Sequence, residues 1–123
     1  MPGMLIDTDV FVDHLRGSRR LAVGLAARGE EVAYSLITRC ELFAARSADE
    51  RGIRNLLAPM TEIGIDRAIA ERAGSLRRGL GLTTPDALIA ATALERDLDV
   101  VSRDARAFSV AGPRWRDPAE ISS

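Results

Sequence analysis

The chain contains no lysine: all 17 of its basic residues are arginines, set against 18 acidic residues for a formal net charge of −1. The absence of lysine counts against a P-loop or a receiver domain, because both use a lysine at their phosphate site. Arginine binds phosphate well through its planar, permanently charged fork. A biased coding composition also produces an all-arginine chain, so the arginines alone do not establish a nucleic-acid partner.

Cysteine and long apolar runs are equally scarce. Cys40 is the only cysteine, so no disulfide can form within the chain, as is typical of proteins in a reducing compartment. No apolar run approaches the ~18 residues of a membrane span, and the first residues lack the charged start and apolar core of a signal peptide. We therefore expect a cytoplasmic protein with no membrane partner.

Aromatic residues make up only 4% of the chain, too few for a platform on which single-stranded bases stack. Trp115, the single tryptophan, is instead expected to seal a sheet edge or a dimer contact. Cys40 stands next to Glu41, which could suggest a thiol nucleophile. Its spacing from Ile37 and Phe43 favours packing in the core.

Short apolar strand patterns alternate with helical patterns along the whole chain. Expected strands cover 4–6, 31–35, 61–65 and 99–102, and expected helices cover 10–17, 18–28, 35–44, 49–57, 66–78 and 84–96. This alternation predicts an α/β protein with a mainly parallel sheet between helices. At 123 residues the chain should form one domain, 1–123, that buries about two thirds of its unfolded surface, with 1–3 and 117–123 as terminal tails.

The segment from Leu82 to Arg96 carries the clearest helix start. Thr84 suits the N-cap, Pro85 the first helical position and Asp86 the positive end of the helix. The helix interior is almost entirely apolar, so it should be buried on most sides. The Asp86 carboxylate then either accepts hydrogen bonds from the free amides at the start of its own helix or faces a functional site.

Four acids stand where such a sheet would bind a ligand. Ligands bind beyond the carboxyl ends of parallel strands, and Asp7 follows the first strand while Asp104 follows the fourth. Asp86 lies at a helix start. Glu41 lies inside the helix that leaves the second strand, and it reaches this rim only if that helix lies across it.

Convergent carboxylates repel one another and raise each other's pKa unless a cation lies between them. Oxygen ligands suit Mg²⁺ or Mn²⁺, which take one or two carboxylates directly and the others through water. Such a cation can polarise a phosphodiester, lower the pKa of a bound water and stabilise the leaving oxygen. The pattern therefore points to phosphodiester hydrolysis, and without metal at least one acid should have a raised pKa.

Each of the four acids lies in a short motif. The motifs, in chain order, are Leu5-Ile-Asp7-Thr-Asp9, Ser35-Leu-Ile-Thr38-Arg-Cys-Glu41-Leu42, Thr84-Pro-Asp86-Ala-Leu-Ile-Ala-Ala-Thr-Ala-Leu94 and Val101-Ser-Arg-Asp104-Ala-Arg-Ala-Phe108. In this order they resemble the VapC-type PIN-domain ribonucleases, the toxins of bacterial toxin–antitoxin pairs. The resemblance runs from Met4 to about Phe108.

The resemblance implies a PIN-like three-layer α/β/α sandwich and a Mg²⁺- or Mn²⁺-dependent endoribonuclease. It makes an acidic quartet the catalytic metal site: Asp7, Glu41, Asp86 and Asp104. Supporting positions are Thr8, Asp9, Thr38 and Ser102, where Ser102 replaces an expected threonine but keeps the hydroxyl. The family further implies an RNA substrate, a cognate antitoxin that covers the site, and a homodimer.

The arginines nearest to the acids in sequence are the candidate contacts for RNA phosphates. These are Arg39, Arg46, Arg103 and Arg106.

Two other functions compete with a nuclease. A non-catalytic PIN-like module would hold RNA or protein through the same arginines without cutting, although the intact acids argue against it. A haloacid-dehalogenase-type phosphatase would use Asp7 as nucleophile and Asp9 as acid, but such enzymes usually need a lysine and a longer chain.

Overall fold

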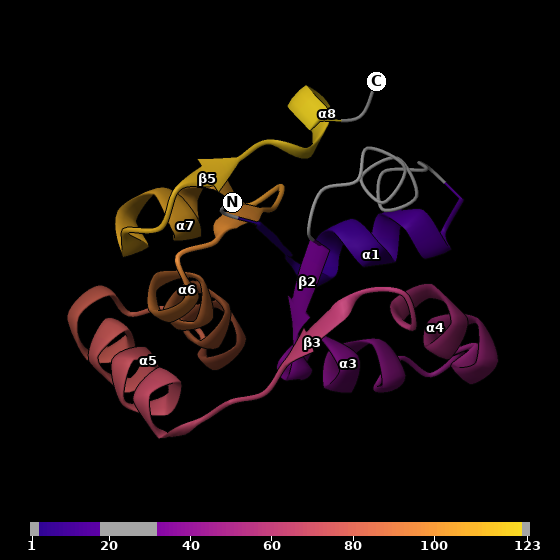
Figure 1. Cartoon of the computed structure of the whole chain (residues 1–123), viewed down its shortest axis with the longest axis horizontal. Helices are drawn as coiled ribbons and strands as arrows, with labels where there is room; N and C mark the ends of the chain where they lie inside the picture. Colours follow the sequence, from indigo (N-terminus) through magenta and orange to yellow (C-terminus); the bar gives the residue numbers. More distant parts are fainter. Residues whose placement is uncertain (1–2, 18–31, 122–123) are drawn as a thin grey trace.

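The computed structural model describes residues 3–17 and 32–121, and the helix expected over 18–28 lies outside this part of the chain. Strands and helices alternate as the sequence predicts (Figure 1). In chain order the elements are β1 (Met4–Ile6), α1 (Thr8–Leu15), β2 (Val32–Ser35), α3 (Leu36–Phe43), α4 (Glu50–Leu57), β3 (Thr61–Ile63), α5 (Arg67–Leu80), α6 (Thr84–Arg96), β4 (Asp99–Val101), α7 (Ala105–Ala111), β5 (Trp115–Arg116) and α8 (Pro118–Ile121).

The five strands form one parallel sheet in the order β3-β2-β1-β4-β5. Strand β2 pairs with one side of β1 and β3 pairs with β2. The chain then crosses to the other side of β1, where β4 pairs with it. The strand order therefore reverses between β1 and β4, and parallel sheets bind ligands beyond the carboxyl ends of the strands at such a reversal. Ile6 pairs with Val101 there, so the residues that follow both strands are neighbours.

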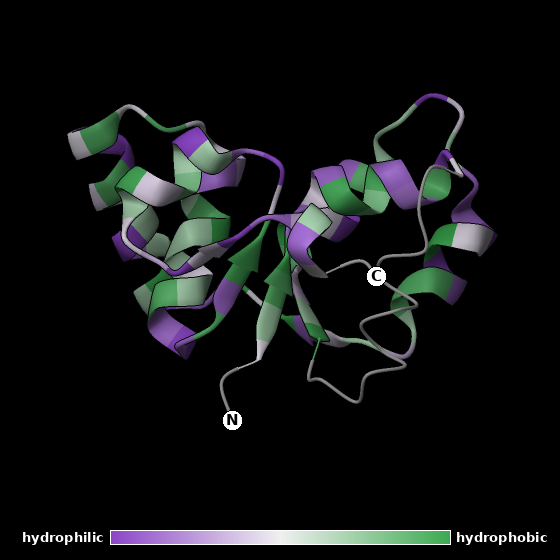
Figure 2. Ribbon diagram, turned by 90° about the horizontal axis from the view of Figure 1, so that it is seen from above, coloured by the Kyte–Doolittle hydropathy of each residue, from purple (hydrophilic) through white to green (hydrophobic). Residues whose placement is uncertain are grey.

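Alternate residues of β1 supply two separate cores. Met4 and Ile6 pack with buried residues of α1, α3 and α4, whereas Leu5 packs with those of α5, α6 and α7. The two groups of helices lie on opposite sides of the sheet (Figures 1 and 2). This arrangement confirms the predicted three-layer α/β/α sandwich with a parallel central sheet.

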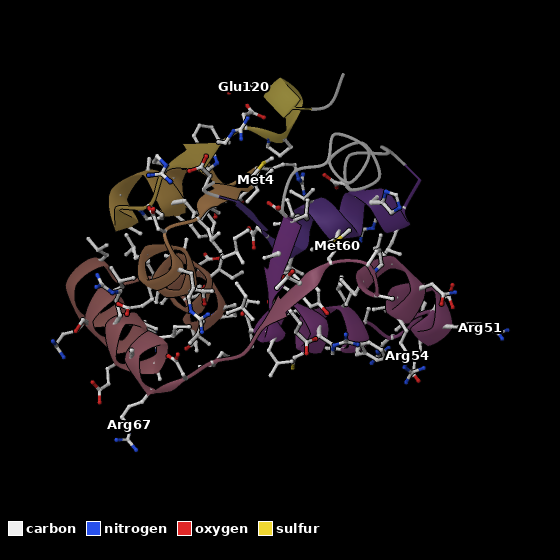
Figure 3. All side chains as sticks on the ribbon, viewed as in Figure 1. Met4, Arg51, Arg54, Met60, Arg67 and Glu120 are labelled. Atoms are coloured by element: carbon white, nitrogen blue, oxygen red, sulfur yellow. The ribbon has the colours of Figure 1, made fainter. Side chains whose placement is uncertain are left out.

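The polar side chains of the helices complete the pattern. Arg51 on α4 and Arg67 on α5 point away from the molecule, while Met4 lies within it (Figure 3). Helix α4 thus buries an apolar face that includes Ile53 and Leu57, whereas α6 is buried on most sides because α5 packs over it.

Side chains cap the N-termini of the helices as the sequence predicts, except at α6, where the capping residue differs. Asp49 and Asp66 cap α4 and α5 as expected, accepting the amides of Gly52 and Ile69 at 3.0 and 2.9 Å. The predicted Thr84 cap of α6 is wrong: Thr83 is the N-cap, and its hydroxyl accepts the Asp86 N–H at 3.3 Å. Proline is tolerated throughout the first turn because its missing N–H has no partner there anyway, so Pro85 did not fix the start to one residue.

The expectation that Cys40 packs in the core is also wrong, since this residue is exposed. Helix α3 instead buries Thr38 and Leu42. Trp115 lies on the edge strand β5 and packs against the α5–α7 core, which confirms its place at a sheet edge. Residues Pro118–Ile121 of the expected tail form the short helix α8.

Within the described ranges, the structure contains no helix long and apolar enough to cross a membrane.

Candidate active site

Asp7 is placed at the sheet reversal by the end of β1. Its N–H donates to the Val101 carbonyl of β4 at 2.9 Å, which continues the strand pairing by one residue. Its side chain caps α1, because Oδ1 accepts the Thr8 N–H at 2.8 Å. Only 6% of Asp7 is exposed, so this carboxylate is held rigidly at the edge of the core.

Ser102 follows β4 and connects three acids through one hydroxyl. Its Oγ donates to Asp7 Oδ2 at 2.7 Å, lies 3.3 Å from Asp9 Oδ2, and accepts the Asp104 N–H at 2.9 Å. Ser102 is fully buried. The hydroxyl kept in place of the expected threonine therefore positions the acids from both sides of the sheet reversal.

Asp9 lies in the first turn of α1 and faces the same end of β4. Its Oδ2 accepts the Arg103 N–H at 3.1 Å. Its Oδ1 is buried and has no hydrogen-bond partner among the residues that the structure describes. A buried carboxylate oxygen without a donor is costly, and a bound cation would remove that cost.

Glu41 reaches the site from α3, which begins at the end of β2 where Ser35 caps it. The Thr8 hydroxyl donates to Glu41 Oε1 at 2.6 Å, and the hydroxyls of Thr8 and Thr38 lie 2.9 Å apart. The helix does lie across the rim, as the sequence argument required. Thr8 and Thr38 therefore support Glu41, consistent with the supporting positions that the resemblance assigned to them.

Asp86 and Asp104 stand at the starts of two helices on the other side of the site. Asp86 lies half-buried in the first turn of α6. Asp104 is exposed and caps α7, with its Oδ1 accepting the Ala107 N–H at 3.1 Å. Both carboxylates thus lie at the N-terminal end of a helix.

The acids act on one another electrostatically. Burial, together with the charge of Asp9, raises the pKa of Asp7 to about 7, although hydrogen bonds from Ser102 and Thr8 oppose the rise. Burial also raises the pKa of Asp9, against the hydrogen bond and the charge of Arg103. The predicted raised pKa is therefore present at the sheet reversal.

Asp86 connects this pair to the remaining acids. Burial is the largest cause of its raised pKa, and the charges of Asp104 and Glu41 add to the rise. Asp86 in turn raises the pKa of Asp7. The four predicted acids thus share one electrostatic environment, whose negative charge a cation would offset.

As the side chains stand, no three acidic, histidine or cysteine side chains of the described residues converge closely enough to surround one metal ion. The all-oxygen donor set, and an Asp9 Oδ1 to which no described residue donates, nevertheless fit a hard cation. Magnesium binds through one or two carboxylates and keeps several waters. The residues fit a cation held by few direct ligands rather than an all-protein cage.

The four candidate arginines differ in their surroundings. Arg103 pairs with Asp13 at 2.9 Å beside Asp9, and Arg106 lies beside Asp86 and Asp104. Arg46 is exposed in the turn after α3. Arg39 lies instead at the β3 edge, where its guanidinium donates to Glu62 at 2.5 Å and to the Tyr34 hydroxyl at 2.9 Å.

One residue near the acids was not among the expected site residues. The indole N–H of Trp115 donates to the Ser102 carbonyl at 2.8 Å. It thereby connects the edge strand β5 to the backbone of Ser102, the residue whose hydroxyl organises the acids. No motif in the sequence signals this contact, because it depends on β5 pairing beside β4.

Comparisons with known proteins agree with this geometry. A family model described as a PIN domain matches residues 4–113. The chain is 36% identical over 113 residues to Ribonuclease VapC19 of Mycobacterium tuberculosis, covering 85% of this chain and 90% of the relative. It is 34% identical over 111 residues to Ribonuclease VapC10 of the same organism, covering 80% of each.

Solved structures show the same architecture. A chain of a toxin–antitoxin complex from Klebsiella pneumoniae is 32% identical and superposes with a TM-score of 0.76, covering 94% of this chain and 98% of that one. A chain of DNA-bound VapBC from Salmonella typhimurium reaches a TM-score of 0.78 over 96% of this chain and 99% of that one. At 21% identity, the second likeness concerns the fold alone.

Proposed function

The chain belongs to the PIN-domain family, among its VapC-type ribonucleases, and from this premise we propose that it is the endoribonuclease toxin of a toxin–antitoxin pair. It hydrolyses RNA phosphodiester bonds with a divalent cation held by its carboxylates. Membership of this family leaves the haloacid-dehalogenase alternative without support.

One observation carries the proposal: a buried carboxylate oxygen on Asp9, with no hydrogen-bond partner among residues 3–17 and 32–121, lies beside the buried Asp7 at the sheet reversal. Structural acids in a core are normally neutralised by donors or cations of the protein. Here Arg103, the cation that pairs with Asp9 among the described residues, also pairs with Asp13 and lies 3.9 Å from Asp9 Oδ2. The remaining negative charge suits a bound Mg²⁺ or Mn²⁺.

Asp7, Glu41 and Asp86 would hold the cation directly or through water, with Asp104 in a supporting role. When bound, the cation would polarise the phosphodiester and promote attack by water, so no protein nucleophile is required. Ser102, Thr8 and Thr38 fix the orientation of these carboxylates through the hydrogen bonds described above. Asp9 adds negative charge and an oxygen that lacks a partner among the described residues.

The RNA would approach from the side of Asp86 and Asp104, where Asp104 is exposed and Asp86 is half-buried. Arg103 and Arg106 lie beside the acids and would contact RNA phosphates. We also propose Arg46 and Arg39 as phosphate contacts, more distant from the reacting bond. An RNA substrate and a lone cysteine both agree with a cytoplasmic location.

A cognate antitoxin is the second proposed partner, as in the toxin–antitoxin complex from Klebsiella pneumoniae. A groove of about 270 Å³ between α1, α3 and α4 supports this proposal. Its walls include Val12, Leu42 and Ile53, and Glu41 lines the same groove. A segment with apolar side chains and one cation could fill it and block the acids. We further propose that the toxin is a homodimer, which light scattering on the purified protein would test.

The test separates cleavage from binding. Purified protein should cut structured RNA in millimolar Mg²⁺ or Mn²⁺ and stop in EDTA, and its expression should inhibit growth. If RNA stays uncut and Asp7→Asn leaves growth inhibition unchanged, the nuclease proposal is wrong. RNA binding without cleavage would favour the non-catalytic module.

A further inference from the structure

An apolar groove opens directly beside the outer acids, between the α5–α6 connection and α7. Its volume is about 370 Å³, within the range of small-molecule sites. Leu80, Leu82 and Val110 form its apolar lining, while Asp86, Asp104 and Arg106 line the same groove.

Two of these apolar side chains are unusually exposed. Leu80 is 45% exposed and Val110 is 59% exposed, the highest values among the large hydrophobic residues of the described ranges that are exposed. Single exposed apolar residues are common and need no explanation. Two that line one groove beside a candidate active site indicate a surface that a ligand covers.

The groove is held in shape by its own backbone. Helix α5 ends where Gly81 takes a left-handed conformation, with φ of 69°. The Arg77 guanidinium then donates to the Leu82 carbonyl at 3.1 Å, and Thr83 caps α6. On the other wall, α7 buries Phe108 in the core and thereby turns Val110 outward.

Arg106 and Val110 are one helical turn apart on α7, so they lie on the same face of that helix. Arg106 is exposed, and it forms no hydrogen bond or ion pair within the part of the chain that the structure describes. The groove thus offers apolar walls and one available cation. Two carboxylates lie in the same groove and would repel a ligand that consists only of an anion.

A ligand that suits these groups has a flat apolar portion and an attached phosphate. We propose that the groove binds the RNA nucleotide next to the scissile phosphate, with its base against Leu80 and Val110 and its phosphate toward Arg106. This inference rests on the proposed nuclease function and specifies how its site holds the substrate. Because the base must leave its stack to enter, the bound nucleotide is unpaired.

Binding can be tested without cleavage, by amide NMR titration of the ¹⁵N-labelled protein with adenosine 5′-monophosphate. Ribose 5-phosphate, which lacks the base, is the matched ligand. The nucleotide should shift the amides of Gly81, Leu82 and Val110 to saturation, and ribose 5-phosphate should leave them unshifted. Equal shifts with both ligands, or none with the nucleotide, would overturn the proposal.

A double variant and a control variant test the same binding by the same titration. Leu80→Ala with Val110→Ala removes both exposed walls and should weaken nucleotide binding about tenfold. Ile65→Ala is the control, since Ile65 is 39% exposed but lies before α5, outside this groove. Equal affinity in the double variant and the control would also contradict the base-binding groove.

Cleavage of a random single-stranded RNA pool separates this proposal from the function on which it rests. Nucleotide shifts in a protein that cuts no RNA would support the groove and reject the nuclease. If the protein cuts RNA but the nucleotide shifts no amides of the groove, the nuclease function stands and the base-binding proposal is rejected. In an active protein, the double variant should also change which sites are cut.

Discussion

The acids of the site fall into two groups that the fold treats differently. The inner acids, Asp7 and Asp9, follow β1 and are hydrogen-bonded to Ser102. The outer acids, Asp86 and Asp104, stand at the starts of α6 and α7. Asp7 is 6% exposed, whereas Asp104 is exposed. Asp7 therefore bears a desolvation cost that the exposed Asp104 avoids, while the half-buried Asp86 still bears part of it. This gradient suits a fixed cation beside an open substrate surface.

The largest effect should come from Asp7→Asn. Loss of a residue that only supports a metal ligand costs roughly 10–100-fold in affinity or activity, so loss of a carboxylate proposed to hold the cation should cost at least about a hundredfold. The neutral amide also avoids the desolvation of a buried carboxylate. The metal-free variant should therefore be more stable than the original protein at pH 8, as thermal unfolding would show.

Asp104→Asn is the matched change in the outer group. Asparagine caps helices as well as aspartate does, so α7 should keep its start and the melting temperature should not change. Activity should fall by roughly tenfold, within the range for supporting groups. Equal stability gains in both variants would refute the distinction between inner and outer acids.

The next effect is the pH dependence of stability without metal. Because the pKa of Asp7 is raised from 3.8 to about 7, the folded state keeps a proton that the unfolded state has already lost. This contribution is fully present below pH 3.8 and is lost as the pH rises through about 7, a change on the order of 4 kcal/mol. Burial also raises the pKa values of Asp9 and Asp86, so they act in the same direction.

Magnesium should oppose this loss, because it binds the charged carboxylates. The rise in melting temperature on adding Mg²⁺ should grow from pH 5 to pH 8, and Asp7→Asn should flatten it. A metal-induced shift that does not vary with pH would count against an inner carboxylate as ligand.

Ser102→Ala tests how the two groups are connected, since this hydroxyl touches both. Its hydrogen bond lowers the pKa of Asp7, so its loss should raise that pKa further and move the pH–activity profile to higher pH. Activity should fall about tenfold. Ser102→Thr keeps the hydroxyl and should restore the profile, whereas a merely structural role would leave the profile unmoved in both variants.

The placing of acids at the carboxyl ends of parallel strands could be predicted from sequence because it follows from short, local patterns, whereas the strand order depends on long-range pairing and was not predicted. Asp7 directly follows one apolar strand, and Ser102 lies at the end of another, which was expected to include it but stops at Val101. Parallel pairing then brings them together. The place of Glu41 could not be predicted from spacing, since it depends on α3 lying across the rim and on its hydrogen bond to Thr8.

The Cys40 error has a related cause. Apolar periodicity treats Thr38 as a surface residue and shifts the inferred core face of α3 toward Cys40. Thr38 is buried instead, because its hydroxyl forms a hydrogen bond with the Thr8 hydroxyl, 2.9 Å away. A pattern based on hydrophobicity cannot identify a polar residue that is buried because it forms a hydrogen bond with a residue distant in sequence.

The smallest effect should come from Trp115→Phe, which probes the inner group from the edge of the sheet. Phenylalanine keeps most of the packing of the ring against the α5–α7 core but cannot donate to the Ser102 carbonyl. Loss of one partly buried hydrogen bond costs about 1 kcal/mol of stability. Activity should fall a few-fold, with kcat reduced more than KM changes, because Ser102 touches the acids rather than the RNA. A change confined to KM would instead place Trp115 in contact with the substrate.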